Sequence, residues 1–274
     1  MTNQDGELLE VAVAAALDAV SVQRRRLGTV APDRWAEKGV ADFVTEVDVE
    51  AEARIVQRIL AAFPDHTILA EEAADRDGPA SFRETDPAQT RWIIDPLDGT
   101  TNYLHRYPMY AVSIAVMRAG ELAAAVVASG ATDDVWTAVR GGGAFRNGEP
   151  IRVSGIETLG RALIGTGFPF KTPSQLPAYL EQLGRVLRRS AGVRRAGSAA
   201  IDLCHVASGW FDGFWELWLA PWDVAAGTLI VREAGGVVTR LDGQSDVFGA
   251  HGSLLAGNVA MHAALGQLVK GDVS

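Results

Sequence analysis

Two aspartates that follow an apolar run are the first residues in this sequence that point to chemistry. The segment WIIDPLDGTTN spans residues 92–102 and carries Asp95 and Asp98. The apolar run predicts a buried strand, and Pro96 with Gly99 predicts a turn after it. Across such a turn both carboxylates can face one point, together with the carbonyl of Leu97. Oxygen ligands of this kind suit a hard cation such as Mg²⁺.

Glycine and threonine after the second aspartate could bind an anion. Gly99 lets the backbone approach a ligand closely, and the amides of Gly99 and Thr100 could hold a phosphate. An ordinary structural explanation remains open from these residues alone, because two solvated aspartates can simply occupy a turn and cap the next helix.

Other carboxylates stand where predicted elements begin or end. Glu71 and Glu72 directly follow the strand expected at 67–70, which would place one of them at the same sheet edge as Asp95. Asp223 begins a helix expected at 224–233, and Asp48 begins another after Thr45. Each has a simpler explanation as a surface glutamate or a helix N-terminal carboxylate, so each signal is weak by itself.

The sequence excludes several other kinds of site. Cys204 is the only cysteine, so an intrachain disulfide and a thiolate zinc cluster are both ruled out. The five histidines show no metal-ligand spacing, and there is no Gly-x-Ser-x-Gly segment and no phosphate-binding glycine loop ending in lysine. The chemistry therefore depends on carboxylates.

Composition predicts an ordinary globular protein with an acidic surface. The chain has 274 residues, a net charge of −9, a pI near 5.1 and a mean hydropathy of +0.08. This balance argues against nucleic acid or an anionic membrane as a partner. We find no signal peptide and no apolar run near the ~20 residues that span a bilayer, so we expect a cytoplasmic location.

Helical and strand periodicities alternate irregularly along the chain, which predicts a mixed α and β protein in two layered halves. Residues 73–89, with three aspartates and two prolines, predict a surface loop, and Asn147-Gly148 predicts a tight turn between strands. The expected helices lie at 7–27, 49–62, 176–187, 198–207, 224–233 and 259–268, and the expected strands at 67–70, 92–94, 111–117, 122–128, 135–139, 162–164, 213–219 and 254–256.

Taken together, these residues resemble the inositol monophosphatase family of Mg²⁺-dependent, lithium-sensitive phosphatases. The resemblance covers nearly the whole chain and implies an α+β fold, the layered α/β/α/β/α sandwich of the inositol monophosphatase and sugar phosphatase type. Residues 1–150 would form an N-terminal half with most metal ligands, and residues 151–274 a C-terminal half with the substrate contacts. The matching pieces occur in the family's order: Asp42–Asp48, Glu71-Glu72, Trp92–Tyr103, Gly197–Ala200 and Trp222–Gly227.

The resemblance implies a role for each matching position. Two or three Mg²⁺ ions are expected, with the ligands Glu71, Asp95, the Leu97 carbonyl, Asp98 and Asp223. Thr100 and Asp48 resemble the pair that orients and deprotonates the attacking water, with Glu72 nearby, and Lys38 resembles a loop lysine of the family. The expected substrate contacts are Asp98, Gly99, Thr100, Gly197, Ser198, Ala199, Glu216 and Asp223.

The implied activity is hydrolysis of a small polyol or sugar phosphomonoester, with myo-inositol 1-phosphate first among the substrates. Histidinol phosphate, fructose 1,6-bisphosphate and 3′-phosphoadenosine compounds are alternatives within the family, and a homodimer is expected. Two hypotheses lie outside this family. One is a phosphatase that forms an aspartyl-phosphate, whose motif usually begins with Asp-x-Asp, and the other is a non-catalytic interaction module. Five arginines between 185 and 195 could form a second anion site or a solvated surface.

Overall fold

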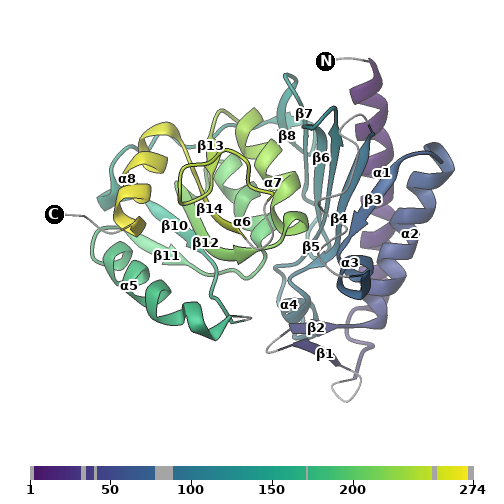
Figure 1. Cartoon of the computed structure of the whole chain (residues 1–274), viewed down its shortest axis with the longest axis horizontal. Helices are drawn as coiled ribbons and strands as arrows, with labels where there is room; N and C mark the ends of the chain where they lie inside the picture. Colours follow the sequence, from purple (N-terminus) through teal and green to yellow (C-terminus); the bar gives the residue numbers. More distant parts are fainter. Residues whose placement is uncertain are drawn as a thin grey trace.

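A computed structural model describes residues 3–31, 35–39, 42–77, 89–170, 172–248 and 252–270 of the chain. Its elements form five layers, which agrees with the sandwich expected from the sequence (Figure 1). The helices are α1 (Asn3–Arg26), α2 (Glu46–Ala62), α3 (Glu71–Asp77), α4 (Thr100–Leu104), α5 (Leu176–Leu187), α6 (Ala199–Ala207), α7 (Pro221–Glu233) and α8 (Val259–Lys270), with 3₁₀ turns at Leu159–Arg161 and Pro173–Gln175.

The larger sheet has seven strands in the order β3-β4-β5-β6-β7-β8-β9. Only β3 and β4 are parallel, and each later strand pairs antiparallel with the one before it. Short turns suffice for such pairs, as at Ala119-Gly120 and Asn147-Gly148, where all four residues have positive φ. The strands are β3 (Thr67–Ala70), β4 (Arg91–Asp98), β5 (Ala111–Arg118), β6 (Glu121–Ser129), β7 (Val135–Val139), β8 (Gly143–Arg146) and β9 (Glu149–Pro150).

The smaller sheet has five strands in the order β11-β10-β12-β14-β13. Strand β10 pairs parallel with both β11 and β12, whereas β14 pairs antiparallel with β12 and β13. A two-stranded hairpin of β1 and β2 lies apart from both sheets. The remaining strands are β1 (Ala36–Gly39), β2 (Asp42–Val44), β10 (Leu163–Thr166), β11 (Gly192–Arg194), β12 (Gly213–Leu219), β13 (Val237–Thr239) and β14 (Gly252–Gly257).

Three apolar clusters hold the layers together. Helices α1 and α2 cover the outer face of the seven-stranded sheet, α6 and α7 fill the space between the sheets, and α5 and α8 cover the five-stranded sheet. Leu8, Ala12, Ala15 and Ala19 of α1 recur at helical spacing and are all buried, so this face can lie close to the strands. Burial of both faces explains why β4 to β6 are almost continuously apolar.

Three helices begin earlier than the sequence predicted, and α1 does so by beginning at Asn3 rather than Glu7. Helix α2 begins at Glu46 rather than Val49, because Thr45 is the cap and Asp48 is the third helical residue. Helix α7 begins at Pro221 rather than Val224, because proline suits the first helical turn and needs no hydrogen-bond partner there. Asp48 and Asp223 therefore lie inside their helices rather than in front of them.

Other boundaries also differ from the prediction. Strand β10 begins at Leu163, after a 3₁₀ turn, where Asp212 accepts a hydrogen bond from the Leu163 amide at 2.6 Å. Helix α3 occupies the beginning of the loop predicted at 73–89, whereas residues 78–88 lie outside the described part. The turn expected between Asp95 and Asp98 is an irregularity inside β4, which keeps its pairing with β5 on both sides. Strands β1, β2, β11 and β13, each of three or four residues, were not predicted.

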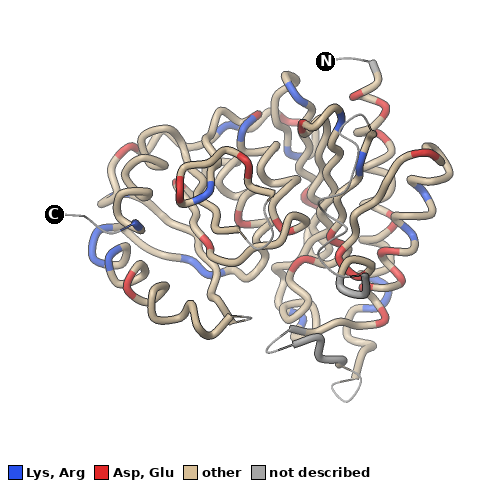
Figure 2. Tube along the Cα trace, viewed as in Figure 1, with Lys and Arg blue, Asp and Glu red and all other residues tan. Residues whose placement is uncertain are grey.

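Charged residues of both signs alternate around the outside of the molecule (Figure 2). This agrees with the expectation that most of the acidic surplus is solvated surface. Among the described residues, no helix is long and apolar enough to cross a membrane.

Candidate active site

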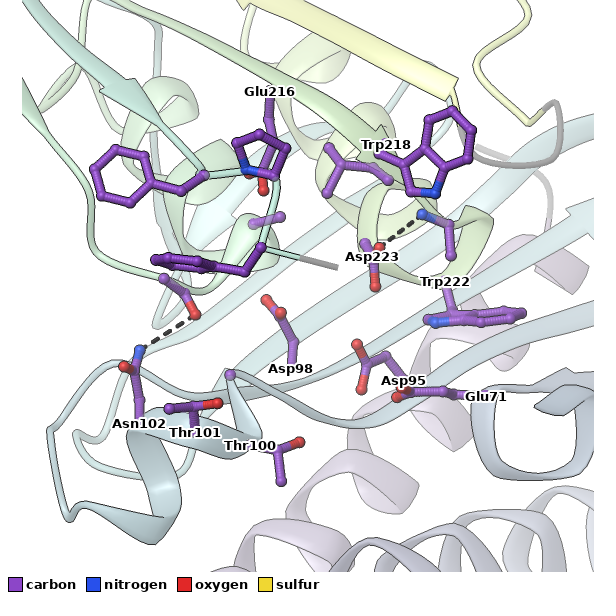
Figure 3. Close-up of a pocket in the computed structure, with 18 of the residues that line it drawn as sticks. Glu71, Asp95, Asp98, Thr100, Thr101, Asn102, Glu216, Trp218, Trp222 and Asp223 are labelled. Carbon is purple, nitrogen blue, oxygen red and sulfur yellow. Dashed lines mark hydrogen bonds between the residues drawn. The ribbon is translucent and has the colours of Figure 1, made fainter. Parts of the chain in front are cut away.

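A cavity of about 540 Å³ opens where the ends of the two sheets face each other (Figure 3). Segments far apart in the sequence line it, including α3, the end of β4, α4, β12 and the start of α7. Ten of the residues that the sequence predicted as site residues line this cavity: Glu71, Asp95, Leu97, Asp98, Gly99, Thr100, Gly197, Ala199, Glu216 and Asp223.

Asp95 lies at the centre of the carboxylates. Its side chain is only 2% exposed, and its Oδ1 accepts a hydrogen bond from the Leu97 amide at 2.9 Å. Burial raises its pKa well above the usual value, and the negative charges of Glu71, Asp98 and Asp223 raise it further. All four carboxylates therefore act on the same small region, and Figure 3 shows them around one space.

Asp98 joins the two halves of the chain. Its Oδ2 accepts hydrogen bonds from the Ser198 hydroxyl at 2.6 Å and the Ala200 amide at 2.8 Å. Both donors belong to the N-terminal end of α6, where the helix dipole favours a negative charge. Ser198 is therefore buried behind Asp98 and does not itself line the cavity.

Asn102 adds a second connection between the same two segments. Its side-chain amide donates to the carbonyls of Ala196 at 2.9 Å, Gly197 at 3.2 Å and Met109 at 2.6 Å. At Gly99, φ is +90°, and a side chain there would meet the Met109 carbonyl at 2.8 Å. Glycine is thus required at this position both by the backbone and by the close approach of the neighbouring chain.

Asp223 both caps a helix and lines the cavity, which are the two roles that the sequence left open. Its Oδ2 accepts a hydrogen bond from the Ala220 amide at 2.7 Å and thereby caps α7. The side chain also lines the cavity, opposite Asp95. A helix-capping carboxylate can therefore belong to a charged site as well.

Asp48 and Thr100 are in contact. The Thr100 hydroxyl lies 3.2 Å from Asp48 Oδ1 and 3.1 Å from the Leu97 carbonyl. The other oxygen of Asp48 accepts from the amide and the hydroxyl of Thr45, at 2.9 and 2.6 Å. Burial raises the pKa of Asp48 to about 6, and Glu71 adds to the rise while the bonds from Thr45 oppose it. This carboxylate can therefore exchange a proton near neutral pH.

Two further predicted residues lie behind the cavity wall. Asp48 is 1% exposed and reaches the cavity only through Thr100. Glu72 is also buried and does not line the cavity, and its amide donates to Glu52 Oε2 of α2 at 2.9 Å. A role of Glu72 in catalysis stays a prediction, and the side chain of Lys38 lies outside the described part of the chain.

Several wall residues were not predicted from the sequence as site residues. Phe168, Phe170 and Trp218 form apolar parts of the wall, and Arg195 lies over the first two rings at 5.2 and 5.1 Å. Arg195 is therefore part of the cavity rather than only a solvated flank. Arg185 instead binds the carbonyls of Leu268 and Val269 at the end of α8, at 2.7 and 2.8 Å. The spacing of these aromatic residues does not predict a site. Only the Gly-Phe-Pro-Phe segment at 167–170 could have indicated some of them in the sequence.

The donor set fits a hard divalent cation. The cavity offers carboxylate oxygens and the Leu97 carbonyl, and their mutual repulsion would fall if a cation bound. Among the described residues, no three His, Cys, Asp or Glu side chains already form a closed metal cluster. Binding would therefore require the carboxylates to turn further toward each other.

Comparisons with known proteins identify the family of this chain. A model of the inositol monophosphatase family matches residues 4–272. An inositol-1-monophosphatase of Mesorhizobium japonicum is 43% identical over 97% of both chains, and the Nus factor SuhB of Escherichia coli is 43% identical over 92% of this chain and 90% of its own.

Solved structures show the same architecture. The extragenic suppressor protein suhB of Bartonella henselae superposes with a TM-score of 0.88 at 39% identity, covering 97% of this chain and 100% of its own. An inositol monophosphatase of Anabaena gives a TM-score of 0.80 at 36% identity, covering 98% of this chain and 97% of its own. By its sequence and its layers, this chain belongs to the inositol monophosphatase family.

Proposed function

We propose that this protein hydrolyses a small polyol phosphomonoester, with myo-inositol 1-phosphate as its substrate, in a reaction that depends on Mg²⁺. The observation that carries the proposal is the meeting of four carboxylates from three separate elements beside the Thr100–Asp48 pair. The name of the Mesorhizobium relative supports inositol 1-phosphate as the substrate.

The family is metal-dependent, and we propose which residues hold the metal in this chain. Glu71, Asp95 and the Leu97 carbonyl would hold one Mg²⁺, and Asp95, Asp98 and Asp223 would hold a second. Glu71 and water could hold a weaker third ion. Bound there, Mg²⁺ would favour deprotonation of water and neutralise negative charge on the phosphate and the leaving oxygen.

The chain's own groups would position the reactants. The Thr100 hydroxyl would accept a hydrogen bond from the attacking water while it donates to Asp48, which receives the proton. The amides of Gly99 and Thr100 would hold the phosphate at the start of α4. Gly197, Ala199 and Glu216 line the cavity where the alcohol part of the substrate would bind, while Ser198 holds Asp98 in place.

A matched pair of proteins tests this function. The wild-type protein should release phosphate from myo-inositol 1-phosphate only when Mg²⁺ is present, and a panel of other phosphomonoesters ranks its specificity by kcat/KM. Asp98→Asn keeps the acceptor for Ser198 and Ala200 but removes a negative ligand, so turnover should fall at least ~10³-fold while the protein stays folded. Full activity of the folded variant would refute the proposed site.

A second candidate role comes from the similarity to a protein named Nus factor SuhB. We propose that such a role would not require turnover, so the Asp98→Asn protein should still support it in a transcription assay. Loss of that role together with turnover would instead tie it to the intact metal site. Lithium inhibition, a homodimer and a cytoplasmic location stay predictions.

A further inference from the structure

Glu216 is packed directly against a residue that has no side chain. Glu216 lies on β12, and Gly167 follows the last residue of the parallel strand β10. A Cβ atom on residue 167 would lie 1.8 Å from Glu216 Oε1 and 1.9 Å from its Cδ. Gly167 is absent from the glycines with positive φ, so space rather than backbone conformation requires glycine here.

A buried carboxyl group of α6 lies near Glu216. Asp202 of α6 is 1% exposed, and neither of its oxygens has a hydrogen-bond partner in the described structure. Burial raises the pKa of Asp202 well above its usual value, and among the charges that add to this rise that of Glu216 has the largest effect. The raised pKa favours the neutral form of Asp202, so its charge does not limit the position of Glu216.

The end of β10 is itself held firmly. The Thr166 hydroxyl lies 3.1 Å from the Tyr179 hydroxyl and 3.2 Å from the Gly167 carbonyl, and both Thr166 and Tyr179 are buried. The backbone at residue 167 therefore cannot readily move away from Glu216. A side chain there would have to be accommodated by Glu216, whose carboxylate is the flexible end of the contact.

We propose that Gly167 is a specificity-determining position: its missing side chain leaves the space in which the Glu216 carboxylate lies beside the cavity, where it accepts a hydrogen bond from a hydroxyl of a polyol phosphate. This inference rests on the proposed function and adds a positioning residue to it. Any side chain at 167 should reduce recognition of the polyol part and leave phosphate transfer largely intact.

The test compares a substrate rich in hydroxyl groups with one that lacks them. For Gly167→Ala, the ratio of kcat/KM for myo-inositol 1-phosphate to that for phenyl phosphate should fall about tenfold, the loss expected for one hydrogen bond to a charged group. The change should reside in KM for the inositol ester. Adding Gly167→Ala to a Glu216→Asp protein should change the ratio less than about twofold, because the shorter side chain avoids the clash.

Gly165→Ala is the matched control on the same strand. Its Cβ would meet the ring of Phe211 at 2.7 Å, in the apolar core and not beside Glu216. It should lower stability without changing the substrate ratio. An unchanged ratio in Gly167→Ala, or an equal fall in the Glu216→Asp background, would overturn the inference. A wild-type protein that hydrolyses neither ester would instead refute the proposed function.

Discussion

The Thr100 hydroxyl has one hydrogen and two acceptors within reach, Asp48 Oδ1 and the Leu97 carbonyl. It can donate fully to only one of them at a time. If the Leu97 carbonyl is used as a metal ligand, Asp48 remains the acceptor, and the hydroxyl oxygen can then receive a hydrogen bond from water. A single side-chain rotation would thus couple metal binding to the orientation of the attacking water.

The half-buried histidine His205, outside the site, should make the stability of the protein depend on pH. His205 lies among the rings of Trp136, Trp210 and Phe211, and burial lowers its pKa from 6.5 to about 4. Between these values the unfolded chain binds a proton that the folded chain does not. The free energy of unfolding should therefore decrease as the pH falls from 6.5 toward 4, by about 1–3 kcal/mol for this residue.

Replacing the imidazole with phenylalanine isolates this contribution. His205→Phe keeps an aromatic ring in the cluster but cannot take up a proton. Urea unfolding of both proteins at pH 7, 6, 5 and 4.5 should show a shallower decrease in the variant. Parallel curves for the two proteins would mean that His205 does not bind protons differently in the folded and unfolded states.

At the scale of elements, α1 supports the site from the opposite face of the seven-stranded sheet. Gln23 is fully buried, and its side-chain amide donates to the Pro96 carbonyl at 2.9 Å. The Tyr103 hydroxyl in α4 donates to the Gln23 carbonyl at 2.9 Å. One residue of α1 therefore holds both the irregular part of β4 and the short helix that follows it.

Gln23→Leu tests this support because it keeps the volume but removes the donor. We expect the free energy of unfolding to fall by about 1–3 kcal/mol, since the buried Pro96 carbonyl loses this partner. The Mg²⁺ concentration for half-maximal activity should rise, since Asp95 and Asp98 flank that carbonyl. Gln57→Ala, on the exposed face of α2, is the control and should change neither quantity. Equal behaviour of both variants would contradict the role.

At the scale of the whole molecule, the cavity lies between the layers, and the acidic side chains that line it repel one another. Asp95 and Asp98 come from the seven-stranded sheet, whereas Glu216 comes from the other sheet and Asp223 from the helix layer between them. The apolar contacts of α6 and α7 with both sheets must oppose this repulsion when no cation is present. A bound cation should therefore stabilise the entire fold.

Thermal unfolding with Mg²⁺ or with a chelator measures this effect. Magnesium at one hundred times its Kd should add about 2.7 kcal/mol to the stability of the wild-type protein and raise its Tm. In Asp223→Asn the same rise in Tm should require a higher Mg²⁺ concentration, because one proposed metal ligand has lost its charge. With chelator, this variant should be at least as stable as the wild type. A Tm independent of Mg²⁺ in both proteins would exclude a metal bound at this cavity.

Much of the fold followed from patterns that are local in the sequence. Continuous apolar runs predicted β4 to β6, because strands covered on both faces need no polar side. Helix boundaries were less certain: Pro221 was taken to precede α7, although a proline is well accommodated in the first turn. Four short strands, β1, β2, β11 and β13, escaped prediction, although β3 and β10, which have only four residues, were predicted from their apolar residues.

The sequence alone determined the kind of chemistry, because the residue types and spacing around Asp95 and Asp98 favour an oxygen-ligand cation site. Only the tertiary structure decided which of the other predicted residues, each a weak signal by itself, line the cavity. It placed Asp223 and Glu216 in the cavity, moved Asp48 and Ser198 behind its wall, and set Gly167 against Glu216. The reason is physical: side-chain direction, burial and mutual repulsion depend on distances between segments that lie about fifty to more than a hundred residues apart, and no local pattern encodes these distances.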